Sequence, residues 1–167
     1  MTNLKTIMIY GIGIYFLVIL LMFIFQRSLL YLPSKESLDN SYYTKTGLKK
    51  IEMTTSDGLV LSSLFKKPSD DEKSIIVVFH GNAGHIGHRV EKFRPFLKEG
   101  YGLFLVEYRG YGENSGKPSE SGLYKDGEAA LNFLYKQGIP QQKTILYGES
   151  LGCGLAVKLS TETAFNA

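Results

Sequence analysis

The 167-residue chain carries 19 basic and 16 acidic side chains, a net charge of +3, and is long enough for one domain with a core but too short for two large ones. Beyond residue 27, 17 basic and 16 acidic side chains remain, without a dense basic cluster. This near-neutral balance lacks the electrostatic footprint of a nucleic-acid-binding domain, so we expect no nucleic-acid partner. The single cysteine, Cys153, excludes an internal disulfide and a multi-cysteine zinc site, and we expect it to be a small buried residue.

The first feature along the chain is an uncharged apolar stretch of 19 residues, Ile7–Phe25. As a helix it would measure about 28 Å, close to the thickness of the bilayer hydrocarbon. A cleaved signal peptide is the alternative, but it would need a shorter apolar region and small residues at a cleavage site, which residues 25–29 do not offer. We therefore predict an uncleaved anchor that contacts the lipid bilayer through residues 7–25.

The charges that flank this stretch give its orientation. Arg27, Lys35 and Lys45 follow it, whereas Lys5 and the terminal amino group precede it. Because basic residues favour the cytoplasmic side, the pattern favours a single-pass membrane protein with a cytoplasmic globular part. We divide the chain into an anchor over residues 1–27, a juxtamembrane connector over 28–47, and a globular domain over 48–167.

The globular part begins with a hairpin pattern and continues with buried strands. Two β-prone runs flank an Asp-Gly turn signal at Asp57-Gly58, which is typical of an antiparallel hairpin. Later apolar runs are continuous, as in strands that are covered on both faces. The expected strands cover residues 50–54, 59–65, 75–79, 103–106 and 144–147.

Helical spacing separates these strands. Apolar residues recur in helical register from Ile86 to Leu97, where Pro95 should kink or split the helix, and again from Leu123 to Leu134. A third helix follows residue 150. We expect Asp126 and Glu128 to occupy exposed or capping positions of the second helix, with structural roles. Strands that alternate with helices predict an α/β fold with a mostly parallel sheet, whose functional site lies at the carboxyl ends of the strands.

The strongest motif is G-x-S-x-G at residues 148–152, between an apolar strand and a helix. This context is typical of a nucleophile elbow, a tight turn that holds a serine hydroxyl above the sheet. We predict Ser150 as the nucleophile, in a strained backbone conformation. The backbone N–H of Leu151, at the start of the following helix, is the first predicted donor to a developing oxyanion.

A second donor is expected from the loop after strand 75–79. His80-Gly81-Asn82-Ala83-Gly84 lies there, and its small residues would let the backbone approach a substrate carbonyl group. We assign the second oxyanion donor to the backbone N–H of Asn82. The alternative is an ordinary loop between a strand and a helix.

Several segments together are similar to those of one known family. They are residues 25–33, 80–84, 107–112, 118–126 and 148–152. In this order they resemble the membrane-anchored α/β-hydrolase-domain proteins related to the bud-emergence hydrolase. The resemblance implies an α/β-hydrolase fold and a serine hydrolase that acts on esters, thioesters or amides without a cofactor.

The chain departs from this family after Ser150, since residues 151–167 contain no aspartate and no histidine. In the α/β-hydrolase fold the acid and the histidine of the triad follow the serine. We therefore expect a carboxyl-terminally incomplete hydrolase domain with little turnover. The alternatives are a non-catalytic membrane-anchored remnant or fragment, which we favour for this chain alone, and a binding module that reuses the cleft.

The chain has three histidines, His80, His85 and His88. Two of them lie about one helical turn apart, a spacing that could in principle hold a metal ion. No cysteine and no third suitable histidine supports such a site, so we predict capping or surface roles and no metal. Use of one of the three as the catalytic base is a further, weaker alternative.

Overall fold

The computed structural model describes residues 3–38 and 43–162, and it divides the chain into two compact units, Met1–Leu32 and Pro33–Ala167. The first unit consists of helix α1 (Leu4–Leu30), none of whose residues is buried. It includes the whole predicted stretch Ile7–Phe25, and its mean hydropathy reaches 2.7. By length and composition α1 could cross a membrane, but a signal sequence near the amino terminus would have the same length and composition.

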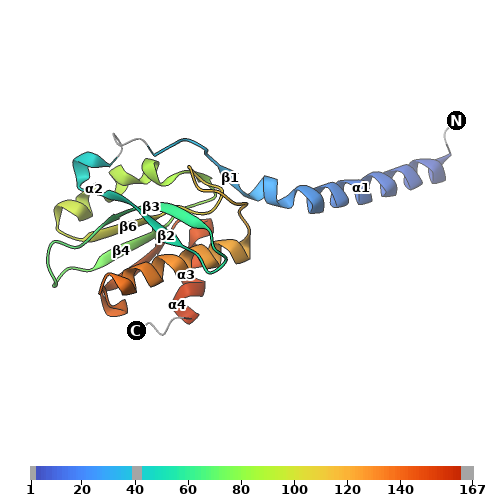
Figure 1. Ribbon diagram of the computed structural model, residues 1–167. Coiled ribbons are helices and arrows are strands. Elements are labelled where there is room, and N and C mark those ends of the chain that lie inside the picture. The colour runs from blue at the N-terminus through green and yellow to red at the C-terminus, as the bar shows by residue number, and fades with distance from the viewer. Residues whose placement is uncertain (1–2, 39–42, 163–167) are drawn as a thin grey trace. The chain divides into compact units, whose positions relative to one another are not determined.

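The second unit is built on a five-stranded mixed sheet (Figure 1). Its strands are β2 (Lys49–Thr54), β3 (Val60–Lys66), β4 (Ile75–Phe79), β6 (Gly102–Val106) and β7 (Thr144–Gly148). The strand order is β2-β3-β6-β4-β7, with β2, β3 and β6 antiparallel in turn and β6, β4 and β7 parallel. The predicted α/β fold, a mostly parallel sheet with an antiparallel hairpin at its start, is confirmed.

The hairpin forms where the Asp-Gly signal predicted it. Gly58 has a φ of +83°, which glycine adopts without strain, and the N–H of Thr55 donates to the carbonyl of Leu59 at 2.9 Å. Lys49 pairs with Phe65 and Thr54 with Val60. Strand β2 begins one residue before its predicted start, at Lys49. Strand β3 is shifted by one residue at both ends, so that it begins at Val60 and ends at Lys66.

Helices cover both faces of the sheet. The helical segments are η2 (Thr44–Thr46), η3 (Ile86–Arg89), α2 (Val90–Lys98), α3 (Glu120–Lys136), η4 (Gln141–Lys143) and α4 (Leu151–Glu162), and two-residue strands are β1 (Leu32–Pro33) and β5 (Ala83–Gly84). Figure 1 shows α3 and α4 together on one side of the sheet, in orange and red. Pro95 does not split the helix as predicted, because it lies inside α2, which continues to Lys98; the helical segment instead changes from η3 to α2 after Arg89.

The core follows the alternation of side chains along the central strands. Ile76 and Val78 of β4 belong to a buried cluster with Phe93 of α2. On α3, Phe133 makes edge-on or tilted ring contacts with Phe65 and Phe104, at centroid distances of 5.1 and 5.4 Å. The sheet is therefore packed on both faces, which explains why the strands read as continuous apolar runs.

Two expectations about single residues were wrong. Cys153 is exposed in the first turn of α4, where its thiol donates to the Gly148 carbonyl at 3.1 Å. Asp126 is fully buried rather than exposed or capping, and accepts hydrogen bonds from the backbone N–H and the Nε of Arg109 at 2.9 and 2.8 Å. Burial raises the pKa of Asp126. By contrast, the Arg109 guanidinium lowers the pKa of Asp57, which it also binds.

Candidate active site

The site begins at the turn between β7 and α4. Ser150 has a φ of +48°, and it is the one residue other than glycine with a positive φ among residues 3–38 and 43–162. Such a conformation costs about 1–3 kcal/mol and persists only where the surrounding structure holds it. Ser150 is exposed, so its hydroxyl is accessible from solvent.

Glycines on either side of Ser150 allow this turn to close. A Cβ at Gly148 would lie 2.5 Å from the Cα of Cys153, and a Cβ at Gly152 would lie 2.0 Å from the carbonyl oxygen of Phe79. The N–H of Glu149 donates to that same Phe79 oxygen at 2.9 Å. The elbow therefore rests directly on the end of β4, as the motif predicted.

The loop after β4 lies beside Ser150. A Cβ at Gly81 would lie 3.7 Å from the Cβ of Ser150 and 3.5 Å from the carbonyl oxygen of Glu149. Asn82 is half-buried in this loop, and Leu151 is half-buried at the first position of α4. The structure thus brings together the parts of the chain that carry Ser150, Asn82 and Leu151, whose chemical roles remain predictions.

His80 controls the peptide that carries the Asn82 N–H. Its Nδ1 lies 2.7 Å from the carbonyl oxygen of Gly81, to which it can only donate. That carbonyl belongs to the same peptide group as the N–H of Asn82, and in a trans peptide the two point in opposite directions. The contact with His80 therefore turns the Asn82 N–H away from the buried ring.

The ring of His80 is held in turn by buried groups. Its Nε2 lies 2.9 Å from the Oε1 of Glu107, at ion-pair distance but without a hydrogen bond, and both side chains are almost fully buried. The other carboxylate oxygen of Glu107 accepts from the N–H of Ile86 at 3.0 Å. Glu107 thus joins both ends of the loop.

Two tyrosines fix two further carbonyl groups of the loop. The Tyr108 hydroxyl donates to the His80 carbonyl at 2.9 Å, and the Tyr111 hydroxyl donates to the Asn82 carbonyl at 2.8 Å. The Tyr108 ring also packs against His80, with centroids 4.2 Å apart. Burial raises the pKa of Tyr108 well above its usual range, so it stays a donor.

Arg89 connects the loop to the elbow. Its Nη2 donates to the Ala83 carbonyl at 2.8 Å and its Nη1 to the His85 carbonyl at 3.0 Å, while its Nε lies 3.4 Å from Glu149. Lys92 also pairs with Glu149. Burial alone would raise the pKa of Glu149, but Lys92 and Arg89 outweigh it and lower that pKa.

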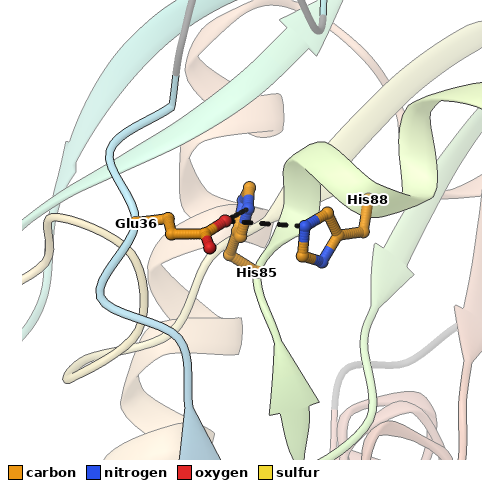
Figure 2. Close-up of side chains that lie close together, drawn as sticks. All are labelled: Glu36, His85 and His88. Carbon is orange, nitrogen blue, oxygen red and sulfur yellow. Dashed lines mark hydrogen bonds and ion pairs between the residues drawn. The ribbon is translucent and has the colours of Figure 1, made fainter.

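A histidine pair and a carboxylate meet beside this loop (Figure 2). The Oε2 of Glu36 lies 3.2 Å from the Nε2 of His85 and 3.7 Å from the Nε2 of His88. Glu36 is a potential third ligand, from the connector, that the sequence reasoning missed because it lies 49 residues before His85. Burial lowers the pKa of His88.

The hydrogen bonding of His85 does not fit a metal ligand. Its Nδ1 caps η3 by accepting from the N–H of Gly87 at 3.1 Å. The neutral ring therefore carries its proton on Nε2, the atom that would have to bind the metal. The arrangement fits a hydrogen-bonded link between Glu36 and the loop, which agrees with the capping role predicted for this histidine.

The sequence indicated the elbow and the loop but not the residues that hold them. Glu107, Tyr108 and Tyr111 stood out only as part of a resemblance, and nothing near Arg89 in the sequence suggested that it would join two loops. The sequence did carry one signal for the two tyrosines. Tyr108 and Tyr111 follow β6, which is parallel to β4, so they lie at the same edge of the sheet as the loop after β4.

Comparison with known proteins gives the family. Residues 70–165, more than half of the chain, match the family described as serine aminopeptidase, S33. The chain belongs to this family of α/β hydrolases. The chain is also 32% identical over 147 residues to the protein bem46 of Schizosaccharomyces pombe. The match covers 83% of the chain and 49% of that protein. The resemblance to bud-emergence-type hydrolases is thereby confirmed.

Two other relatives also support a hydrolase family. The α/β-hydrolase-domain protein WAV2 of Arabidopsis thaliana is 34% identical over 81% of the chain and 47% of its own length. The lysophosphatidylserine lipase ABHD12 of Danio rerio is 38% identical over 57% of the chain and 25% of its own length. The chain thus spans about half the length, or less, of these curated relatives.

Solved structures support the fold. An esterase of Pyrococcus furiosus superposes with a TM-score of 0.65 at 23% identity, over 81% of the chain and 52% of the esterase. An α/β hydrolase of Vibrio vulnificus gives a TM-score of 0.67 at 24% identity, over 80% and 49%. At this identity the likeness establishes the α/β-hydrolase fold alone.

Proposed function

We propose that this chain carries the nucleophile and the oxyanion hole of a serine hydrolase that cleaves an ester, thioester or amide. The observation that supports this most is the positive φ of Ser150 next to Gly81. A strained, exposed serine between a strand and a helix, beside a small-residue loop, is the arrangement that acyl transfer requires.

In the proposed reaction the Ser150 Oγ attacks the carbonyl carbon of the acyl group. The backbone N–H groups of Asn82 and Leu151 stabilise the negative charge that forms on the carbonyl oxygen. Collapse of the tetrahedral intermediate expels the alcohol, thiol or amine and leaves an acyl group on Ser150, and water then hydrolyses this acyl-enzyme. Both steps require a base to take the proton from the attacking oxygen.

The histidines that the structure describes are occupied by other contacts. His80 faces Gly81 and Glu107, and His85 faces Gly87 and Glu36. His88 is exposed and directed toward Glu36 (Figure 2). We therefore propose that the 167-residue chain turns over slowly by itself. The second candidate, a non-catalytic membrane-anchored form of the hydrolase, is favoured by this engagement of all three rings.

The substrate class follows from a relative and from α1. One relative is named for a lipase activity on lysophosphatidylserine, and α1 could hold this chain at a membrane. We propose that α1 spans the membrane once, with the globular part in the cytoplasm, and that the acyl substrate is a lipid ester or an acylated molecule at the membrane surface.

A fluorophosphonate probe tests the proposed nucleophile. The full chain in detergent micelles should be labelled slowly, and Ser150→Ala should abolish labelling. Ser160→Ala, which removes an exposed hydroxyl from the helix that follows Ser150, should leave labelling unchanged. Labelling that survives Ser150→Ala would contradict the assignment. Complete absence of labelling would favour the non-catalytic form, whereas rapid labelling would show that a base is already in place.

A further inference from the structure

A basic pocket lies away from the candidate active site. It has a volume of about 240 Å³ and is lined by Lys45, Thr46, Lys66, Arg94, Leu97 and Lys98. These residues come from η2, the end of β3 and the second half of α2. No acidic residue is among the described residues that line it, so four cationic side chains surround one small space.

The pocket faces the other end of the sheet from Ser150. Lys66 pairs with Leu103 near the start of β6, whereas Gly148 of the elbow pairs with Phe79 at the end of β4. Its volume is below the 300–1,000 Å³ that is typical of pockets for drug-sized ligands. The pocket therefore suits a small charged group better than the acyl chain of a substrate.

One of the cations is already held in place. The Nζ of Lys66 donates to the Thr46 carbonyl at 2.9 Å, which leaves two of its three protons for another acceptor. A Cβ at Gly47, whose φ is +78°, would lie 3.2 Å from that Nζ, so the turn packs closely against the ammonium group. Such preorganisation lowers the entropic cost of binding an anion.

Arg94 adds a guanidinium group whose side chain is 42% exposed. Its Nη2 pairs with Glu91, which does not line the pocket. The C-terminal dipole of α2 accounts for Lys98 in the last turn, but it does not account for Lys66 on β3.

We propose that this pocket binds a phosphate group, which the Lys66 Nζ and the guanidinium group of Arg94 contact. Phosphate offers several acceptor oxygens and a charge that would offset four neighbouring cations, and arginine is well suited to it. The group could belong to an anionic phospholipid headgroup or to a soluble phosphate compound. The proposal is independent of hydrolysis at Ser150.

Two measurements on the full chain in detergent micelles or nanodiscs test the proposal. Calorimetric titration with inorganic phosphate tests the soluble source. Native mass spectrometry after release from nanodiscs of equimolar phosphatidylcholine and phosphatidic acid tests the headgroup source. We expect saturable phosphate binding, selective retention of phosphatidic acid, or both, and the positive measurement identifies the source.

Variants locate the site. Lys66→Gln with Arg94→Gln should weaken binding by at least about tenfold. Lys35→Gln with Lys117→Gln removes the same charge from exposed positions outside the pocket and should change binding by less than about twofold. Arg94→Lys keeps the charge but loses the planar guanidinium group, so its effect should be intermediate. Thermal unfolding of each variant establishes that it is folded. Equal loss in both double variants, or no binding by the unmodified chain in either measurement, would overturn the proposal.

Discussion

Arg89 and Glu149 join the two loops of the candidate active site. The Nε of Arg89 lies 3.4 Å from the Glu149 carboxylate, while its Nη2 donates to the Ala83 carbonyl at 2.8 Å. One guanidinium thus contacts both the residue before Ser150 and the loop that carries the Asn82 N–H. This geometry ties the position of the proposed nucleophile to that of the proposed oxyanion donor.

We expect Arg89→Ala to loosen the loop that begins at His80 without unfolding the domain, because three contacts to that loop and the elbow disappear together. Hydrogen exchange followed by mass spectrometry should show faster exchange in peptides that cover residues 80–90. Arg94→Ala, which removes a guanidinium from the same part of the chain but not from this loop, is the control. Similar exchange in both variants would contradict the linking role of Arg89.

The lowered pKa of Glu149 predicts a pH-dependent contribution to stability. Because the folded state holds this pKa below its usual value of 4.5, the ionised group stabilises the fold above about pH 4.5, and this contribution is lost as the pH falls through the lower folded value. The difference in the free energy of unfolding between the unmodified chain and Glu149→Gln should therefore be largest near neutral pH and shrink on acidification. Glu128→Gln, at an exposed position of α3, serves as the control. A difference that grows on acidification would refute the assigned ion pairs.

Two glycines of α4 should respond to alanine in opposite ways. A Cβ at Gly152 would lie 2.0 Å from a backbone oxygen of β4, whereas one at Gly154 would meet nothing within 4 Å. Gly152→Ala should therefore lower the free energy of unfolding by about 1–3 kcal/mol or more. Gly154→Ala should raise it by up to about 1 kcal/mol, because alanine favours the helix. Denaturant unfolding measures both, and a tolerated Gly152→Ala would contradict the close contact of the elbow with β4.

Strand β7 forms an edge of the sheet in the described part of the chain, and Ile145 on it is 47% exposed. An apolar edge strand can pair with another chain, so we expect the full chain to self-associate in detergent. Ile145→Lys should increase the monomer fraction measured by size-exclusion chromatography with light scattering. Val157→Lys places the same charge at a 63% exposed apolar position on α4 instead, and an equal effect there would argue against edge pairing.

Membrane insertion of α1 can be tested by extraction with alkaline carbonate. The full chain should remain in the membrane fraction and keep residues 1–27. Leu17→Arg with Leu21→Arg should release it, since an arginine at the centre of a spanning helix costs about 2.5–3.5 kcal/mol. Gln26→Arg should not, because a long side chain near the helix end can reach the interface. A mature amino terminus after Arg27 would instead indicate a signal sequence.

Local patterns in the sequence determined much of this molecule. The apolar stretch of α1, the Asp-Gly turn between β2 and β3, the buried runs of β4 and β6, and the elbow at Ser150 depend on residues that are close in the chain. Their side-chain period and turn chemistry leave few alternatives. The sequence therefore indicated the α/β class, the strand boundaries to within about a residue, and the serine.

Only the tertiary structure decided which distant side chains meet. Asp126 is buried beside Arg109, and Cys153 is exposed in the first turn of α4. Lys45, Lys66 and Arg94 looked like scattered surface charges in the sequence, yet they line one pocket. Burial and charge pairing depend on how elements pack, and packing joins residues whose separation along the chain carries no information about their contact.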